Sequence, residues 1–430
     1  MNKNINIAIV GLGQIGSYLL NELSIKKKEI EIKTGKIIYI QAISAKNINK
    51  KRKFKINKKI FFKNPLDIFK KKRIDILFEA VGLSDGISKR IVIAALKKKI
   101  HVITPNKALI AKHGDYLSKL AEKNKVNLEF EASVAGGIPI LRTIKEGLAT
   151  NRISKVYGIL NGTTNYILSE MENSNDTFKN VLKKAQSLGY AEPGNPKFDI
   201  NGTDAFSKVR ILSSLSFNNK ISKTKCLMEG IENIELKDIE IANQLNLRIK
   251  LLGISQIIDK QLFETVHPAL VSKNTYIGNV NGVMNAVILE GKPIGETILQ
   301  GEGAGPGPTS SSLLSDLLSI LRGNIKYPFG ISSNKRKSIK CYDLDNYTNS
   351  LYLRFEVKDK PGVLSTITNR LAKYKISIKR IIQTPDKKNN KATIIIITHK
   401  TNELNSKKCL SIFKKNKYIL KFPTLIRLYN

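Results

Sequence analysis

A glycine-rich turn close to the start of the sequence restricts the fold more than any other feature. Residues 5–10 form a short apolar run typical of a buried strand, and apolar residues return at helical spacing directly after the turn. The turn itself consists of Gly11, Leu12, Gly13, Gln14, Ile15 and Gly16. This pattern between a strand and a helix is typical of dinucleotide sites, where glycines allow the backbone to approach a pyrophosphate. A loop that is merely rich in glycine is the alternative.

Strand-like and helical patterns then alternate along the chain. Apolar runs of strand type occur at residues 36–44, 74–81 and 100–104, and helical patterns such as residues 88–96 lie between them. Strands that alternate with helices are typical of βαβ units, whose strands pair in parallel. The sequence therefore predicts a doubly wound α/β domain of Rossmann type over residues 1–135.

The residues after the second predicted strand bear on which dinucleotide binds. NAD sites commonly have an acidic residue there to hold the ribose 2′-hydroxyl, and residues 44–52 contain none. Ser44, Lys46 and Arg52 could instead accommodate a 2′-phosphate, which favours NADP over NAD. The alternative is that these cations belong to the lysine surplus of the whole chain, so NAD stays open.

The charge balance raises a nucleic-acid function and then argues against it. The 430 residues include 73 lysines and arginines against 35 acidic residues, a formal charge of +38. These cations are spread over the whole chain, and no basic stretch is interleaved with stacking aromatic residues. Because there is neither a long apolar run nor a leader segment, we expect a cytoplasmic protein without a membrane partner. Three widely spaced cysteines predict neither a disulfide framework nor a zinc site.

Later motifs place polar or flexible residues where predicted strands end. Lys107 follows the strand at 100–104, at the end of a sheet where ligands bind in such folds, although a solvated cation is the plainer interpretation. Residues 130–139 run from a strand into Gly136-Gly137 and a helix that begins near Pro139, which suits a ligand site or a hinge. After residue 150 the pattern becomes α+β, and the run NGTTN at 161–165 either lines a pocket or caps a helix.

A group of charged residues in a stretch of turn and helix start calls for explanation. It consists of Glu192, Asp199, Asp204 and Lys208. Asp204 and Lys208 stand four apart on a predicted helix whose buried stripe is Ala205, Val209 and Leu212, so they project from one face. Taken alone, such a pair is usually a surface ion pair.

Seven segments, in matching order and spacing, resemble homoserine dehydrogenase. They are GLGQIG (11–16), TPNKAL (104–109), EASVAGGIPI (131–140), GILNGTTNYIL (158–168), GYAEP to GTDAFSK (189–208), VNGVMNAV (280–287) and GEGAGPGPT (301–309). From residue 351 the sequence resembles an ACT regulatory domain, with a strand, a turn at 359–362, a helix, two strands, a helix and a strand. Each segment is short, but seven in order make coincidence implausible.

The resemblance implies a reaction and roles for the charged residues. It implies reversible NAD(P)-dependent interconversion of L-aspartate 4-semialdehyde and L-homoserine, a step toward threonine and methionine. Hydride addition to an aldehyde leaves negative charge on oxygen, and Lys208, oriented by Asp204, is then the proton donor and acceptor. Glu192 and Asp199 are expected to bind the substrate ammonium, and Lys107 to reach the substrate oxygen or the nicotinamide. The segment around Gly303 is expected to fold over the cofactor.

The resemblance also implies a cation site. A monovalent cation, with sodium favoured, is expected at main-chain oxygens of Glu131, Val134, Gly136 and Ile138. Two departures from the family pattern concern other segments. The turn at 192–196 carries an extra residue, which weakens the assignment of Asp199, and Pro306 interrupts the 301–309 run and removes a backbone donor.

The expected organisation has four parts. They are an NAD(P)-binding Rossmann domain (1–135), an α+β catalytic, substrate and dimerisation domain (136–325, with 302–325 returning to the nucleotide domain), a linker (326–349) and a βαββαβ ACT domain (350–430). The ACT domain implies feedback by L-threonine in a homodimer or homotetramer, and a domain kept only for dimer contacts is the alternative. Because the nucleotide motif begins at residue 11, we expect the monofunctional form without a fused kinase half.

Overall fold

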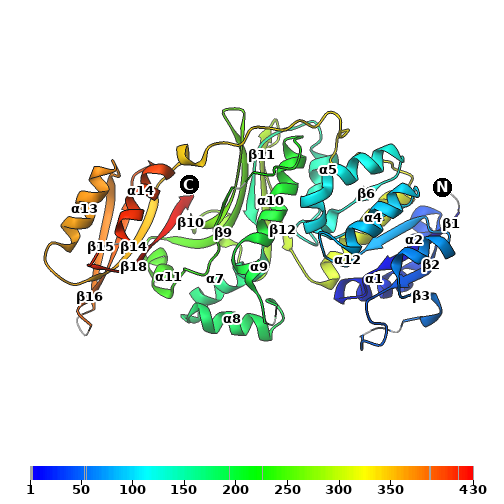
Figure 1. Cartoon of the computed structure of the whole chain (residues 1–430), viewed down its shortest axis with the longest axis horizontal. Coiled ribbons are helices and arrows are strands. Elements are labelled where there is room, and N and C mark those ends of the chain that lie inside the picture. The colour runs from blue at the N-terminus through cyan, green and yellow to red at the C-terminus, as the bar shows by residue number, and fades with distance from the viewer. Residues whose placement is uncertain are drawn as a thin grey trace.

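Three regions follow one another along the long axis of the molecule (Figure 1). The computed structural model describes residues 3–52, 54, 56–192, 194–224, 226–386, 389–414 and 416–429. We call the regions the N-terminal domain, built on strands β1 to β6, the central domain, built on β7 to β12, and the C-terminal domain, built on β13 to β18. In Figure 1 they run from blue on the right to red on the left.

The N-terminal domain is a six-stranded parallel sheet in the order β3-β2-β1-β4-β5-β6. This is the doubly wound order of dinucleotide-binding folds, in which the strand order reverses beside β1. The strands are β1 (Asn4–Val10), β2 (Ile37–Ser44), β3 (Phe61–Phe62), β4 (Ile76–Glu79), β5 (His101–Ile103) and β6 (Leu128–Glu129). The helices are α1 (Gln14–Ile25), α2 (Lys27–Thr34), α3 (Ile68–Lys71), α4 (Ile87–Lys97) and α5 (Lys107–Lys123).

A helix from much later in the chain completes this domain. Helix α12 (Pro306–Leu321) packs against α1, and its apolar face joins the core formed by β1 and α1. Leu313, Leu317 and Ile320 of α12 are fully buried there. The chain therefore leaves the N-terminal domain, builds the central domain and returns. Two segments of the main chain thus connect the two domains.

The central domain places helices on one face of a mostly antiparallel sheet. Its strands are β7 (Arg152–Ile159), β8 (Leu227–Met228), β9 (Leu247–Ile258), β10 (Gln261–Ser272), β11 (Met284–Lys292) and β12 (Gly295–Glu302). Its helices are α6 (Ile140–Arg142), α7 (Gly162–Ser174), α8 (Phe178–Ser187), α9 (Lys197–Ile200), α10 (Thr203–Ser216) and α11 (Leu236–Gln244). Helices α7, α10 and α11 contact the strands directly, and α10 buries Ala205, Val209 and Leu212 against them.

The C-terminal domain extends the same sheet. It has the βαββαβ order of β14 (Leu351–Lys358), α13 (Val363–Lys373), β15 (Ile378–Asp386), β16 (Lys391–Thr398), α14 (Glu403–Phe413) and β18 (Ile419–Tyr429), with a small ribbon of β13 (Thr348–Asn349) and β17 (Thr401–Asn402). Strand β18 pairs antiparallel with β14 and, over residues 427–429, parallel with β10. The result is one 10-stranded sheet, β12-β11-β7-β9-β10-β18-β14-β16-β15 with β8 beside β10.

The α/β class, the doubly wound N-terminal sheet and the βαββαβ order predicted from the sequence are confirmed. The predicted runs at 36–44, 74–81 and 100–104 contain β2, β4 and β5, with shorter bounds for the last two. Strand β3 was not predicted because two residues show no period. The strand expected to enter the double glycine ends at Glu129, and Glu131–Ser133 form a short 3-10 turn.

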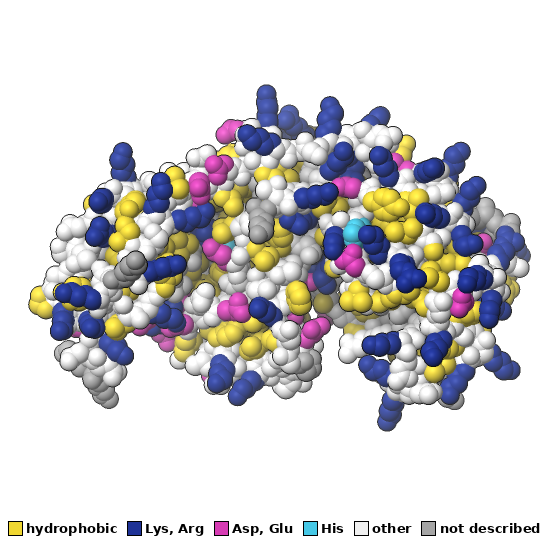
Figure 2. Space-filling view, viewed as in Figure 1, with side chains coloured by type: hydrophobic (Ala, Val, Ile, Leu, Met, Phe, Trp, Pro, Cys, Tyr) yellow, Lys and Arg dark blue, Asp and Glu magenta, His cyan; other side chains and the backbone are white. Residues whose placement is uncertain are grey.

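Positive charge is distributed rather than gathered on the surface. Figure 2 shows lysine and arginine side chains over the whole visible face of all three domains, without a single stripe. This distribution suits the interpretation that the lysine excess is a general property of the chain. In the described part of the chain, no helix combines the length and the apolar character that crossing a bilayer requires.

One buried histidine in β10 predicts acid sensitivity. His267 is 1% exposed, its Nδ1–H donates to the oxygen of Pro268 (2.9 Å), and burial together with the charge of Arg427 lowers its pKa to about 3. Between pH 6.5 and 3 the unfolded chain binds a proton at this position and the folded chain does not. The free energy of unfolding therefore decreases by about 1.4 kcal/mol for each unit by which the pH is lowered. We expect urea midpoints to fall less steeply below pH 6.5 in His267→Leu than in the wild type. Parallel slopes would contradict this.

Candidate functional site

The glycine-rich turn lies between β1 and α1. Gly11 follows β1 with φ +99°, and α1 begins at Gln14 with Gly13 as its N-cap. A Cβ on Gly16 would lie 1.9 Å from the oxygen of Gly11, so only glycine allows the helix to start this close to the strand. A Cβ on Gly13 would meet nothing within 4 Å, so the turn faces open space. The helix N-terminus and its free N–H groups are therefore available to an anion.

The loop beside this turn contains the residues predicted to select the cofactor. Ser44 ends β2, and its side chain is buried. Its main-chain carbonyl oxygen accepts a hydrogen bond from Gly11 N (2.9 Å). Lys46 is exposed. Arg52 folds back over the turn and donates to the oxygens of Leu12 (3.0 Å) and Asn47 (2.6 Å). The guanidinium thus holds the 47–52 loop against the glycine turn.

Two lysines from different domains share one carboxylate. Lys107 begins α5 of the N-terminal domain, and its Nζ lies 2.9 Å from Oδ1 of Asp204. Lys208, one turn after Asp204 on α10, lies 2.8 Å from Oδ2 of the same carboxylate and donates to the oxygen of Leu160 (2.6 Å). Lys208 is only 7% exposed. The predicted i,i+4 pair is therefore buried, not a surface ion pair.

The two ammonium groups determine the charge of the carboxylate. Burial alone would raise the pKa of Asp204, but the charges of Lys208 and Lys107 lower it well below its usual range. In turn, the charge of Asp204 raises the pKa of Lys107. Asp204 is therefore ionised at any physiological pH, and it holds a cation on each of its oxygens.

Asn161 joins Asp204 to a second acid. Its Nδ2 donates to Oδ1 of Asp199 (3.0 Å) and Oδ2 of Asp204 (2.9 Å), while its Oδ1 accepts from Thr164 N and caps α7. Burial and the charge of Asp204 raise the pKa of Asp199. The two alternatives left open for the NGTTN run are both realised, because Asn161 caps the helix and lines the site. Its spacing before a helix indicated only the cap.

These side chains line a cleft of about 550 Å³ between the N-terminal and central domains. Glu192, Asp199, Asp204, Lys208 and Lys107 all contribute to its wall, with Glu192 exposed at the 189–192 turn. Pro193 of that turn lies outside the described residues. The glycine turn reaches the same cleft through Gln14 and Ile15, and the returning segment through Gly303 to Gly305. Ser44 and Lys46 do not line it.

A buried carboxylate that the sequence analysis missed holds the loop before Lys107. Glu79 ends β4 and is fully buried. Its oxygens accept from Ser88 Oγ, Val81 N (2.9 Å), Thr104 Oγ1 (2.6 Å) and Asn106 Nδ2 (3.3 Å). Asn106 in turn caps α5 through Leu109 N. Because Glu79 ties the ends of β4 and β5 to the starts of α4 and α5, it determines where Lys107 stands.

The residues expected to hold a cation lie beside the cleft. Glu131, Val134 and Ile138 are buried and Gly136 lines the cleft, where the main chain turns back through positive φ at Ala135 and Gly136. The Glu131 carboxylate accepts from Leu141 N and Arg142 N (2.8 Å each), so it faces a helix start. Among the described residues no group of three or more His, Cys, Asp or Glu side chains converges on a metal position.

The charge around this segment is compatible with a cation on main-chain oxygens. Three buried acids face two cations in a group that comprises Glu129, Glu131, Asp316, Lys145 and Arg142. Burial and the charges of the two neighbouring acids raise the pKa of Asp316 well above its usual value. With all three acids ionised the group would carry one net negative charge, and the raised pKa of Asp316 shows that its protonation would relieve that charge. A monovalent cation nearby would offset the same charge, so the residues present fit such an ion.

Comparison with known proteins identifies all three regions. The models described as "Homoserine dehydrogenase, NAD binding domain", "Homoserine dehydrogenase" and "ACT domain" match residues 11–131, 139–318 and 351–416. A homoserine dehydrogenase of Neisseria gonorrhoeae is 37% identical over 99% of both chains. The crystal structure of one from Thiobacillus denitrificans superposes with a TM-score of 0.90 at 34% identity, covering 100% of this chain and 99% of that chain.

A more distant solved structure shares the fold alone. It is a hyperthermophilic archaeal homoserine dehydrogenase mutant in complex with NADPH, 23% identical, with a TM-score of 0.62 over 75% of this chain and 99% of that chain.

Proposed function

Because this chain belongs to the homoserine dehydrogenase family, we propose that it reduces L-aspartate 4-semialdehyde to L-homoserine, reversibly, on the way to threonine and methionine. The chain is an NAD(P)-dependent oxidoreductase, as its family shows. The observation that carries the proposed chemistry is the pair of ammonium groups on the Asp204 carboxylate, at the wall of a cleft that the glycine turn also lines.

Lys208 is the proposed proton donor. When bound, the reduced nicotinamide supplies a hydride to the aldehyde carbon. The ammonium of Lys208 has three N–H bonds, and the oxygens of Leu160 and Asp204 accept two of them. The third remains for the substrate oxygen, where it stabilises and then neutralises the developing negative charge. In the reverse direction Lys208 accepts the proton from the hydroxyl of homoserine.

The other charged groups of the cleft suit the remainder of the substrate. Glu192 and Asp199 are assigned to the substrate ammonium, because both carboxylates line the cleft on the central-domain side. Asn161 fixes Asp199 relative to Asp204, which supports the role of Asp199 despite the atypical turn at 192–196. Lys107 holds Asp204 from the N-terminal domain and is assigned to the interface between substrate oxygen and nicotinamide.

A direct assay separates this function from its competitors. The enzyme should oxidise NADPH only when aspartate semialdehyde is added, and should reduce NADP with homoserine at high pH. A nucleic-acid protein would show salt-sensitive retention on DNA and no turnover. An amino-acid sensor without catalysis would bind threonine but leave the absorbance of NADPH unchanged. The absence of turnover with purified, folded protein would refute the proposal.

NADP is the proposed cofactor. Support comes from the lack of an acid after β2 and from Lys46 and Arg52 in the loop that follows it, where Arg52 bonds the glycine turn. We expect kcat/KM to be at least about tenfold higher with NADPH than with NADH, the size of one charge-assisted contact to a phosphate. Lys46→Ala should reduce this ratio through the KM for NADPH, and Lys50→Ala, an exposed lysine of the same loop, should not. A wild-type preference for NADH would overturn the assignment.

A monovalent cation, with sodium favoured, is proposed at the main-chain oxygens of Glu131, Val134, Gly136 and Ile138. The buried acids Glu129, Glu131 and Asp316 beside them, which outnumber their two cationic partners, support it. The ion would fix the 131–140 turn that lines the cleft, and no catalytic step depends on it. Melting temperature should rise with NaCl more than with the chloride of a large organic cation at equal ionic strength, and equal shifts would argue against the site.

The C-terminal domain is proposed to bind L-threonine as a feedback effector. A cavity of about 410 Å³ opens at the turn between β14 and α13, lined by residues 357–364 with Gln383 and Ile394. Strand β15 ends the sheet, so among described strands its outer edge has no neighbour and is free to face a second copy in a homodimer or homotetramer. Inhibition by threonine and the mass in solution test these two points. The domain bounds at 135, 325 and 349 are likewise proposed.

A further inference from the structure

The strongest remaining feature is an arginine of the linker that lies between the two helices of the active site. Helix α5 starts at Lys107 and helix α10 carries Asp204 and Lys208 near its start, so both N-terminal ends face the cleft. The two helices pack against each other. They belong to different domains, and the Lys107–Asp204 ion pair joins them at the cleft end only.

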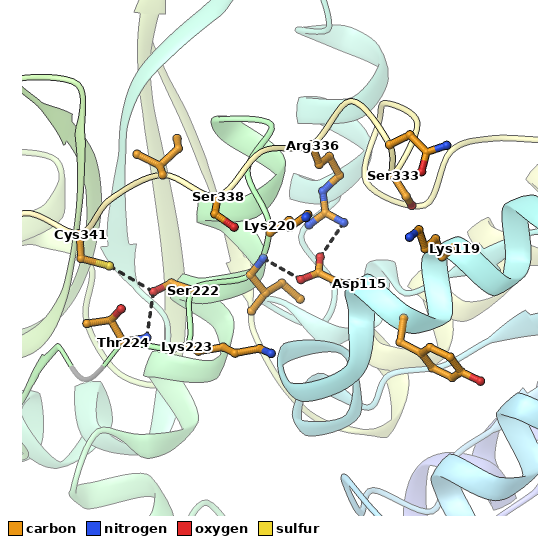
Figure 3. Close-up of a pocket in the computed structure, with 14 residues that line it drawn as sticks. Asp115, Lys119, Lys220, Ser222, Lys223, Thr224, Ser333, Arg336, Ser338 and Cys341 are labelled. Atoms are coloured by element: carbon orange, nitrogen blue, oxygen red, sulfur yellow. Dashed lines mark hydrogen bonds and ion pairs between the residues drawn. The ribbon is translucent and has the colours of Figure 1, made fainter.

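Arg336 joins the same helices farther along. Its Nη1 lies 2.8 Å from Oδ1 of Asp115 on α5, and its Nη2 donates to Ser214 Oγ on α10. Its Nε and Nη2 also donate to the oxygen of Asn219, just after α10 (3.2 and 2.9 Å). Figure 3 shows Arg336 reaching from the linker toward Asp115, and both residues line a cavity of about 650 Å³. At 1.5 Å per residue, Asp115 and Ser214 lie about 12 and 15 Å along their helices from Lys107 and Asp204.

The surroundings make this contact rigid. Arg336 is only 2% exposed, and its guanidinium stacks on Phe329 (3.9 Å to the ring centroid). Phe329 in turn packs on Phe130, and a Cβ on Gly114 of α5 would lie 2.9 Å from its ring. Nearby, Ser333 N donates to the carboxylate of Glu122, also on α5. The linker is thus fastened to α5 and α10 before it reaches the C-terminal domain.

We propose that Arg336 is a positioning residue that fixes α5 and α10 relative to each other. It thereby sets the distance between the cofactor on the N-terminal domain and the substrate on the central domain. This inference rests on the proposed function. Hydride transfer requires the reacting atoms to approach closely, and a displacement of about 1 Å can cost as much as a hundredfold in rate. A tie across both helices limits such displacements without touching substrate.

The test compares Arg336→Met with milder and matched variants. Arg336→Met keeps an apolar stem against Phe329 and removes every hydrogen bond, and Asp115→Asn and Ser214→Ala each weaken one end of the tie. Lys119→Ala, an exposed lysine of the same cavity, is the control. We expect kcat to fall about ten- to a hundredfold in Arg336→Met and less in the milder variants, with KM for NADPH within about threefold of wild type.

The isotope effect separates positioning from stability. With NADPH deuterated at the transferred position, the effect on kcat should rise in Arg336→Met, because hydride transfer becomes slower relative to product release. Arg336→Lys should restore part of kcat, since it keeps the charge facing Asp115. The inference is wrong if Arg336→Met has the kcat per folded molecule and the isotope effect of the wild type. Should Arg336→Met not fold, the same two values in Asp115→Asn and Ser214→Ala decide. Loss of turnover in the wild type would instead refute the proposed function.

Discussion

Lys208→Ala should lower kcat for the reduction of aspartate semialdehyde by about a hundred- to ten-thousandfold, the range that a positioned proton donor contributes. The substitution removes the buried ammonium on α10 that donates to Leu160 and Asp204. Lys107 remains paired with Asp204, so the carboxylate keeps one counter-ion and the cleft keeps its shape. KM for the aldehyde should therefore change much less than kcat. NADPH oxidation measured over a range of aldehyde concentrations gives both values.

A second lysine controls for charge and for folding. Lys112 lies on the exposed side of α5 and pairs with Asp85, outside the cleft. Lys112→Ala should retain wild-type kcat, and both variants should be compared by circular dichroism and melting temperature. A Lys208→Ala enzyme with near-normal kcat would show that another group or a water molecule supplies the proton. The family assignment would survive that result, but the proton-transfer role would not.

Arg354→Met should lower the free energy of unfolding by about 3–5 kcal/mol, because it leaves the buried carboxylate of Asp238 without its counter-ion. Arg354 of β14 is 1% exposed, and its Nε donates to Oδ1 of Asp238 on α11 (2.7 Å). Its other nitrogens contact Glu356 (2.8 Å) and Glu235 (3.2 Å). The arginine thus joins the C-terminal domain to the central domain. Since a chain with several domains need not unfold in two states, the shift of each denaturant midpoint is the quantity to compare.

A double substitution distinguishes a lost charge pair from lost packing. Arg354→Met combined with Asp238→Asn removes the buried charge that the single change leaves unpaired, and the one amide oxygen can still accept from Tyr352 Oη, although the bond from Glu235 N is lost. The double variant should therefore be more stable than Arg354→Met alone. Lys373→Met, on the exposed side of α13, should change stability by no more than about 0.5 kcal/mol. If Arg354→Met behaves like Lys373→Met, the pair does not hold the two domains together.

Local patterns explain what the sequence could predict of this site. The glycine turn needs only neighbouring residues, and the shared face of Asp204 and Lys208 follows from helical spacing alone. Their burial could not be read from that spacing, because it depends on the docking of α10 between the sheet and α5. Its place after a predicted strand made Lys107 a candidate and the resemblance gave it a role, but neither showed that it would share the Asp204 carboxylate.

The missed residues have partners that are remote in the chain. Glu79 accepts from four donors, three of which lie between 9 and 27 residues farther along the chain, and Arg336 belongs to a stretch that reads as a polar linker. Neither residue has a periodic or motif signal, since a buried polar tie is recognised only by the groups around it. The pairing of β18 with β10 is similar, because strand periodicity indicates a strand and does not name its neighbour. These contacts are what tertiary structure adds to the sequence.

The junction of β18 and β10 also determines how a signal could travel between the ends of the molecule. Hydrogen-bonded strands rotate relative to their neighbours by a roughly constant angle, so a change of twist in one part of a sheet spreads to the next strand. Strand β10 contacts α10, which carries Asp204 and Lys208. Because backbone hydrogen bonds continue from strand to strand across this boundary, the C-terminal domain meets the central domain through a shared sheet, and a change in the twist of β18 would reach α10 by way of β10.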